Sequence, residues 1–217
     1  MLTPIAKLLD GLTMYNVVIY GLSILAVISV GISFTPYAIF SAPVLLMQFG
    51  VVIVLGLGVN TFLAKLFKAP LNHEPALVTS LILFFLINPD TDFSTKHIIV
   101  LCIAVLAAML SKYVIAWKKR HVFNPAAFGA VVLGLLGIFE PTWWIGSTPL
   151  FIPMLIVGLL ITWKIRRFDT VIPFFIVGFI LFFIQGLQFD DSLLIFKVEA
   201  TKQFISFLQY FQTKFEA

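Results

Sequence analysis

The chain has 217 residues, of which 61% are hydrophobic and 11% charged, and its mean hydropathy is +1.09. A water-soluble domain of this length cannot hide so much apolar surface, because its exterior must be largely polar. The composition therefore predicts an integral membrane protein. The formal net charge of +4 is interpreted as a topology signal rather than as a sign of nucleic-acid binding. The single cysteine, Cys102, excludes a disulfide framework and a cysteine metal site, and we predict no metal site.

Seven apolar runs predict an all-α polytopic bundle, a transmembrane domain over residues 16–188 that follows a lead-in over residues 1–15. Two of the runs hold only about 14 residues, whereas a straight helix needs about 20 to cross a hydrocarbon core roughly 30 Å thick. In chain order the predicted helices cover residues 16–34, 42–63, 75–89, 97–117, 125–139, 149–163 and 171–187.

The C-terminal stretch has a different pattern. Residues 193–215 have an apolar face at helical spacing, with Lys197, Glu199 and Lys202 opposite. This pattern is typical of a helix that lies in the membrane interface. We therefore expect residues 189–217 to form an external interfacial helix or the start of a second half.

Charged turns predict the topology. Basic residues gather at every second turn, and acidic residues occupy the turns between them. Because positive charge is retained in the cytoplasm, the basic turns and the N-terminus are predicted to be cytoplasmic in a multi-pass protein of the plasma membrane. The basic turns carry Lys65 and Lys68, Lys118 to Arg120, and Lys164 to Arg167, and the acidic turns carry Asp90 and Asp92, Glu140, and Asp190 and Asp191.

The two short runs open alike. Glu74-Pro75-Ala76 and Asn124-Pro125-Ala126 each begin one of them, and proline suits a first helical turn because its missing N–H has no partner there. Short, proline-bounded segments in corresponding positions predict discontinuous helices around a central site. The alternative is two ordinary spans that are tilted or kinked.

Two residues near the predicted cytoplasmic face are candidate cofactor contacts. Asn124, at a helix start, would direct backbone N–H groups and a positive helix end toward an anionic ligand, although its simplest role is that of an N-cap. Lys112, inside an apolar run, would contact a cofactor or extend its ammonium group to the headgroups, which is the default so close to a span end.

The turn Gly146-Ser147-Thr148-Pro149 is predicted on the outer face. A threonine between a glycine turn and a proline is most often the cap of the next helix, and the residues alone give no reason to assign a cofactor there. The neighbouring Trp143 and Trp144 are predicted to belong to an aromatic belt at the outer interface.

Three segments resemble one membrane family. Glu74 to Leu81 (EPALVTSL) resembles its S-A-L-V-T segment, and Ser111-Lys112-Tyr113 with His121 to Ala127 (HVFNPAA) resembles its S-K-Y and F-N-P-A segments. Arg167-Phe168-Asp169 is also similar. The family comprises the D subunit of the Rnf ferredoxin:NAD electron-transport complex and the B subunit of the sodium-translocating NADH:quinone reductase, and the resemblance covers residues 70–187.

The resemblance implies a cofactor. In that family flavin mononucleotide (FMN) is esterified through its phosphate to a threonine of an S-G-A-T motif on the outer face, which maps onto Thr148, with Gly146 and Ser147 beside it. It further implies a flavin transferase as a partner, and riboflavin or a second flavin as an additional cofactor toward which Asn124 and Lys112 are candidates.

The resulting expectation is a flavin-carrying subunit of an Rnf-type or related membrane electron-transport complex, coupled to Na⁺ or H⁺ translocation. No catalytic side chain is predicted, because the chemistry belongs to the cofactor. The predicted partners are the other redox subunits and the lipid bilayer. Two alternatives stay open: a flavin-free channel or transporter with paired half-helices, and a flavin-free scaffold subunit.

Overall fold

A computed structural model describes residues 13–90, 94–117 and 120–188. The predicted all-α class is confirmed, apart from one pair of two-residue strands. The chain divides into two compact units, Met1–Ile165 and Arg166–Ala217. The predicted interfacial helix over residues 193–215 and most of the lead-in lie outside the described residues.

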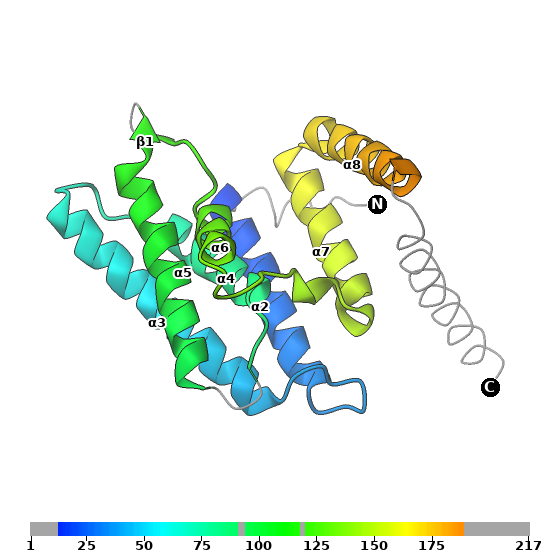
Figure 1. Cartoon of the computed structure of the whole chain (residues 1–217), viewed down its shortest axis with the longest axis horizontal. Coiled ribbons are helices and arrows are strands. Elements are labelled where there is room, and N and C mark those ends of the chain that lie inside the picture. The colour runs from blue at the N-terminus through cyan, green and yellow to red at the C-terminus, as the bar shows by residue number, and fades with distance from the viewer. Residues whose placement is uncertain (1–12, 91–93, 118–119, 189–217) are drawn as a thin grey trace. The chain divides into compact units, whose positions relative to one another are not determined.

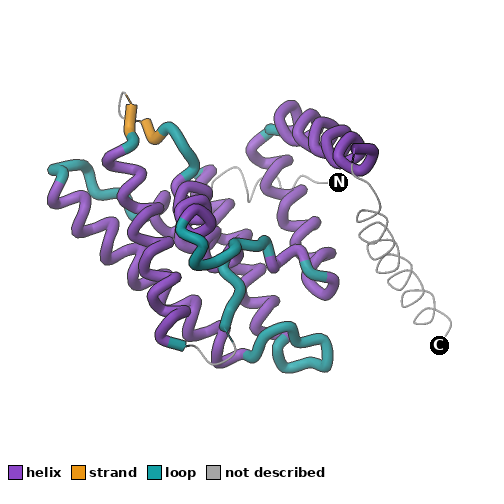
Figure 2. Tube along the Cα trace, viewed as in Figure 1, coloured by secondary structure: helices purple, strands orange, loops and turns teal. Residues whose placement is uncertain are grey.

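Figures 1 and 2 show the described helices. Four of them, α2, α3, α5 and α7, are long and apolar enough to cross a membrane. The second unit contributes α8 (Phe168–Gln188). The first unit contains α2 (Met14–Ile32), α3 (Ala42–Leu66), α4 (Glu74–Leu86), α5 (Thr95–Val114), β1 (Ala116–Trp117), β2 (Arg120–His121), α6 (Pro125–Leu135), the 3₁₀ helix η1 (Trp144–Gly146) and α7 (Thr148–Ile165).

Local sequence signals set several helix ends. The side chains of Thr13, Ser94 and Asn124 accept hydrogen bonds from the first-turn N–H groups of α2, α5 and α6. At the end of α6, Gly137 has a φ of 62°, and Ile138 N donates to Leu133 O at 3.2 Å. This left-handed glycine ends the helix, because residues with a Cβ disfavour that conformation.

The predicted end of the 97–117 helix is wrong by three residues. α5 ends at Val114, and Ala116–Trp117 instead pairs antiparallel with Arg120–His121. Both strands need extended backbone to pair, so the helix cannot continue into Ala116–Trp117.

α4 packs antiparallel to two of its neighbours in the first unit. Gln48, near the start of α3, contacts the last turn of α4 and also His97 at the start of α5. Lys112, near the end of α5, contacts Pro75 at the start of α4. α4 therefore runs opposite to both α3 and α5, as the predicted alternation requires.

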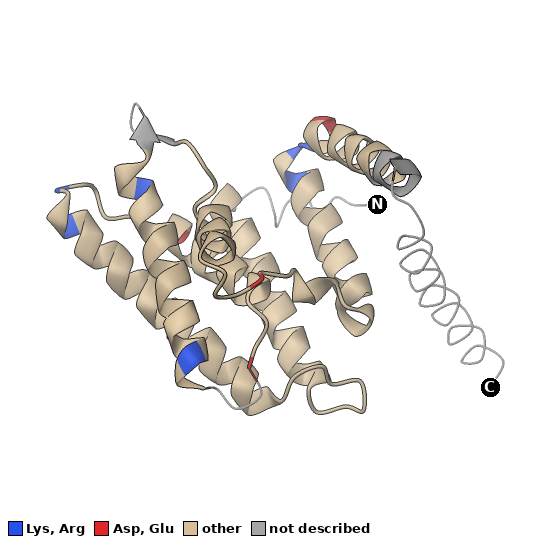
Figure 3. Cartoon of the chain, in the orientation of Figure 1, with Lys and Arg blue, Asp and Glu red and all other residues tan. Residues whose placement is uncertain are grey.

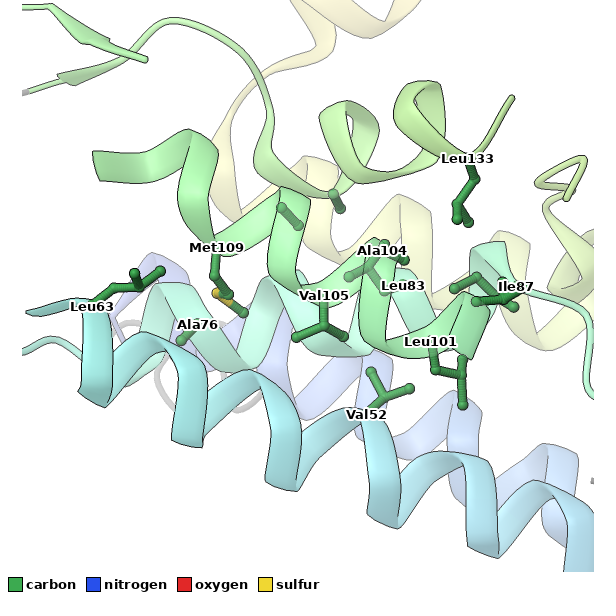
Figure 4. Packing of buried hydrophobic residues seen from close by; sticks show 13 residues of the cluster. Val52, Leu63, Ala76, Leu83, Ile87, Leu101, Ala104, Val105, Met109 and Leu133 are labelled. Atoms are coloured by element: carbon green, nitrogen blue, oxygen red, sulfur yellow. The ribbon is translucent and has the colours of Figure 1, made fainter. Parts of the chain in front are cut away.

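Both hydrophobic clusters of the first unit include α4. Figure 4 shows the first, in which Ala76 lies near Leu63 and Met109, and Ile87 lies near Leu101 at the other end. The second cluster contains the remaining large buried residues of α4, together with side chains from α2, α3, η1 and α7: Leu22, Leu25, Ala26, Leu45, Leu81, Phe84, Phe85, Trp144, Ile145 and Leu150.

Charged side chains divide the bundle into two ends. Lys65, Lys112 and Lys164 lie in the last turns of α3, α5 and α7, which share one side of the bundle in Figure 3. We call this side the basic end. The other side, the acidic end, carries Asp90 and Glu140 in the loops after α4 and α6. Among the described residues of the first unit the division has two exceptions, because Lys96 at the start of α5 lies at the acidic end and Glu74 in the first turn of α4 lies at the basic end.

The two short runs do form short helices, but α4 does not stop half-way along its neighbours. Its first turn lies beside Lys112 and its last turn beside Gln48, so it follows the middle of α3 and is recessed at both ends. The 12 residues from Gln48 to Asn60 of α3 rise about 18 Å, close to the length of about 20 Å for the 13 residues of α4.

Candidate functional site

The carboxyl end of α4 is closed by groups from α3, from η1 and from the loop that precedes η1. Gln48 Nε2 donates to Phe84 O at 3.2 Å and to Ile87 O at 2.7 Å. Trp144 Nε1 also donates to Phe84 O, at 2.9 Å, and Thr142 N donates to Leu86 O at 2.9 Å. The last carbonyls of a helix have no partner within that helix, so a buried end needs such donors.

A histidine extends this polar group. His97 Nε2 lies 2.7 Å from Gln48 Oε1, and both residues are buried. Nearby, Asp90 Oδ2 accepts from Ser94 N at 3.3 Å and from Ser94 Oγ at 2.5 Å. The sequence interpretation did not identify Gln48 or His97. Each could have been identified as a lone polar side chain in an apolar run, since Gln48 lies inside one such run and His97 at the edge of another.

A second polar group closes the amino end of α4. Asn60 Nδ2 donates to Asn72 O at 3.2 Å, and Tyr113 OH donates to Asn60 Oδ1 at 3.0 Å. Lys112 Nζ donates to Pro75 O at 3.0 Å. The ammonium group of Lys112 is thus directed to the first turn of α4, rather than only outward to the headgroups.

Asn124 acts as the N-cap of α6. Its Oδ1 accepts from Ala126 N at 3.0 Å and from Ala127 N at 3.5 Å. The side-chain oxygen therefore uses the helix N–H groups that an anionic ligand would need, which favours the capping role.

The Gly146-Ser147-Thr148 turn lies at the acidic end, between η1 and α7. Thr148 is the first residue of α7, and its side chain is exposed, as is Gly146. Ser147 Oγ is buried and has no hydrogen-bond partner among the described residues. The hydroxyl of Thr148 is thus accessible at the start of α7. The hydroxyl of Ser147 beside it makes no hydrogen bond among the described residues.

The two tryptophans before this turn differ. Trp143 is 42% exposed, as a residue of an interfacial aromatic belt would be, and its Cδ1 lies 3.7 Å from the position of a Cβ at Gly146. Trp144 is buried and stacks edge-on against Phe84, with ring centroids 5.4 Å apart. The prediction that both belong to the belt is therefore wrong for Trp144, whose indole points into the bundle.

The five predicted cofactor contacts do not form one site. Lys112 and Asn124 lie at the basic end, and the segment from Gly146 to Thr148 lies at the acidic end. The 15 residues between His97, at the acidic end of α5, and Lys112 correspond to roughly 22 Å of helix. A single ligand of flavin size cannot contact both groups.

Comparison with models of protein families, with curated protein sequences and with solved structures finds no match to this chain.

Proposed function

We propose that this chain is a membrane-embedded subunit of an electron-transport complex of the Rnf or sodium-translocating reductase type, and that it carries FMN on Thr148. The observation that supports the proposal best is the position of Thr148, exposed at the first residue of α7 on the end opposite the basic turns. A modifying enzyme needs this access to the hydroxyl.

The residues of the turn fit a phosphate ester. Thr148 Oγ1 would form the bond to phosphorus and lose its proton, while the donor, a flavin dinucleotide, would release a nucleoside monophosphate. The amino end of α7 favours the phosphate charge that remains, because it is the positive end of the helix dipole. Gly146 leaves space beside the hydroxyl. When bound, a flavin accepts electrons from one redox partner and passes them to another.

Only the Gly146-Ser147-Thr148 turn belongs to this site. Lys112 and Asn124, at the other end, are candidates solely for a second flavin or riboflavin. Their present contacts, to Pro75 O and to the first N–H groups of α6, argue for structural roles instead.

The topology is part of the proposal. We place the basic end and the N-terminus in the cytoplasm of a seven-span protein in the plasma membrane, because basic turns are retained on that side. Thr148 then faces outward, where the flavin transferase works, and the exposed faces of α7 remain available to the lipid and to the other subunits.

Mass spectrometry after co-expression with a flavin transferase tests the function. The peptide containing Thr148 should gain the mass of the flavin nucleotide in the wild type and in Thr162→Ala, which removes a partly exposed threonine near the other end of α7. Thr148→Ala should lose the increment, and Thr148→Ser should keep part of it. Ser147→Ala shows whether the neighbouring hydroxyl takes the flavin instead.

An unmodified wild-type protein would reject the flavin proposal and favour a scaffold subunit. The side of the membrane on which Thr148 lies is tested separately, in a Cys102→Ser background that removes the single native cysteine. An impermeant thiol reagent should label Thr148→Cys from outside intact cells and should not label Lys68→Cys. The opposite pattern would contradict the topology even if flavin is attached.

A further inference from the structure

His97 is a buried histidine inside a helix that is long and apolar enough to span a membrane. Its exposed fraction is 4%, and that of its partner Gln48 is 0%. His97 lies in the first turn of α5, and burying an ionisable side chain is costly unless it has partners. The arrangement around His97 is independent of Thr148 and of any flavin.

The hydrogen bonds fix the tautomer of His97. Gln48 Nε2 donates to both Phe84 O and Ile87 O, so it is Gln48 Oε1, an acceptor, that faces His97 Nε2. His97 Nε2 must therefore carry a hydrogen in either charge state. It follows that a proton can be gained or lost only at Nδ1.

The surroundings of the ring act on its charge in opposite directions. Burial has the larger effect and disfavours the charged imidazolium, whereas the negative charge of Asp90 favours it, and Asp90 Oδ2 is held by two hydrogen bonds from Ser94. Through Gln48 the ring is also linked to the last carbonyls of α4, which form the negative end of the helix dipole.

The other charges near this end are few among the described residues. α3 and α4 face His97 with the amide of Gln48 and with backbone carbonyls. Lys96 precedes His97 on α5 and is exposed, and Glu140 lies in the loop after α6. Asp92 is outside the described residues.

We propose that His97, Asp90 and Gln48 form a proton-binding site at the acidic end of the bundle, in which a proton from the adjacent aqueous phase binds at Nδ1 of His97. Asp90, in the loop before α5, lies near enough to the ring to favour its positive charge electrostatically. Gln48 holds the ring against the carboxyl end of α4, so the bound charge acts directly on the most buried helix.

Nitrogen NMR of ¹⁵N-histidine-labelled protein in micelles tests the site without altering it. The double variant His73→Gln/His121→Gln leaves His97 as the sole histidine of the chain, so its two ring signals need no further assignment. Between pH 4 and 9 we expect Nε2 to remain N–H throughout and Nδ1 to change from an unprotonated to a protonated shift. The transition should be reversible.

Two outcomes overturn the proposal. A neutral ring with the hydrogen on Nδ1 would exclude the hydrogen-bond arrangement, and a ring that keeps one charge state over the whole range would mean that His97 is only a structural brace. The variant Gln48→Leu is the positive control for the tautomer. Without the Gln48 acceptor, N–H at Nε2 should no longer be the sole tautomer, and a population with N–H at Nδ1 should appear.

Discussion

A comparison of α4 and α7 shows that the longer helix of this bundle is not the more deeply buried one. α4 has 13 residues, seven of them buried, whereas α7 has 18 residues, of which only Leu150 is buried. The reason lies in the backbone. The unpaired N–H and C=O groups at a helix end inside the membrane find no water there, so they need hydrogen-bond partners within the protein. α4 can be short and central because Gln48, Trp144 and Thr142 supply those partners. α7 is long enough to reach both ends of the bundle, so its own ends need no such partners.

The energetic consequence differs for the two helices. Lipid tails are as apolar as leucine, so helices associate in a membrane through close packing and hydrogen bonds rather than through the hydrophobic effect. When the bundle unfolds, the side chains of α4 lose many contacts with other protein side chains. Most side chains of α7 already face away from the protein, so unfolding changes their free energy little.

The largest expected difference comes from truncating one phenylalanine in each helix. Phe84→Ala should lower the free energy of unfolding by about 3 kcal/mol, because it leaves a cavity among Phe49, Phe85 and Trp144. Phe151→Ala, on the exposed face of α7, should change it by about 0.5 kcal/mol or less. Unfolding in mixed micelles by increasing SDS fraction measures both, and equal effects would refute the central position of α4.

A smaller effect is expected from adding one methyl group. Gly56→Ala places its Cβ against Ser80 Oγ of α4 and should cost about 1 to 3 kcal/mol through overpacking. Gly158→Ala in α7 has open space around it and should be neutral or stabilising by up to about 1 kcal/mol, because alanine favours the helix.

The same SDS titration applies, with Gly56→Ala/Ser80→Ala as a third variant. Removing the serine hydroxyl should recover part of the loss. Additive effects in this pair would show that α3 and α4 do not touch at these residues.

The smallest effects are expected from substitutions that remove only side-chain hydrogen bonds. Gln48→Leu removes three of them, to Phe84 O, to Ile87 O and to His97 Nε2, and should destabilise the protein by about 1 to 2 kcal/mol, since each hydrogen bond between membrane helices contributes little. Thr162→Ala breaks only a bond within α7, to Gly158 O, and should have no measurable effect. If the two variants unfold at the same SDS fraction, the carbonyl groups at the end of α4 must find other hydrogen-bond donors.

Much of the helix pattern was predictable, because its signals are local. Asn124 and Pro125 mark the start of α6 exactly where it occurs, and the shortness of both proline-opened helices follows from their apolar runs. The end of α5 was not predictable in this way. The strand pair over residues 116–121 forms by backbone pairing across a turn, and an apolar run that continues to Trp117 does not reveal it.

The candidate site was predictable only in part. The charge pattern already put Asn124 and Thr148 on opposite faces, which agrees with their assignment to two different flavins, and the two residues begin separate helices, α6 and α7. The contact between Gln48 and His97 joins residues 49 apart, and no spacing rule relates them. The burial of Trp144 depends likewise on Phe84, 60 residues earlier in the chain.

The closure of α4 has a consequence for synthesis. Gln48 precedes α4, so the first donor to Ile87 O exists when α4 leaves the ribosome. Thr142 and Trp144 follow α4 by more than 50 residues, after α5 and α6 have been made. The carboxyl end of α4 is therefore completed late, and the most buried helix of the bundle reaches its final bonding only when η1 has been synthesised.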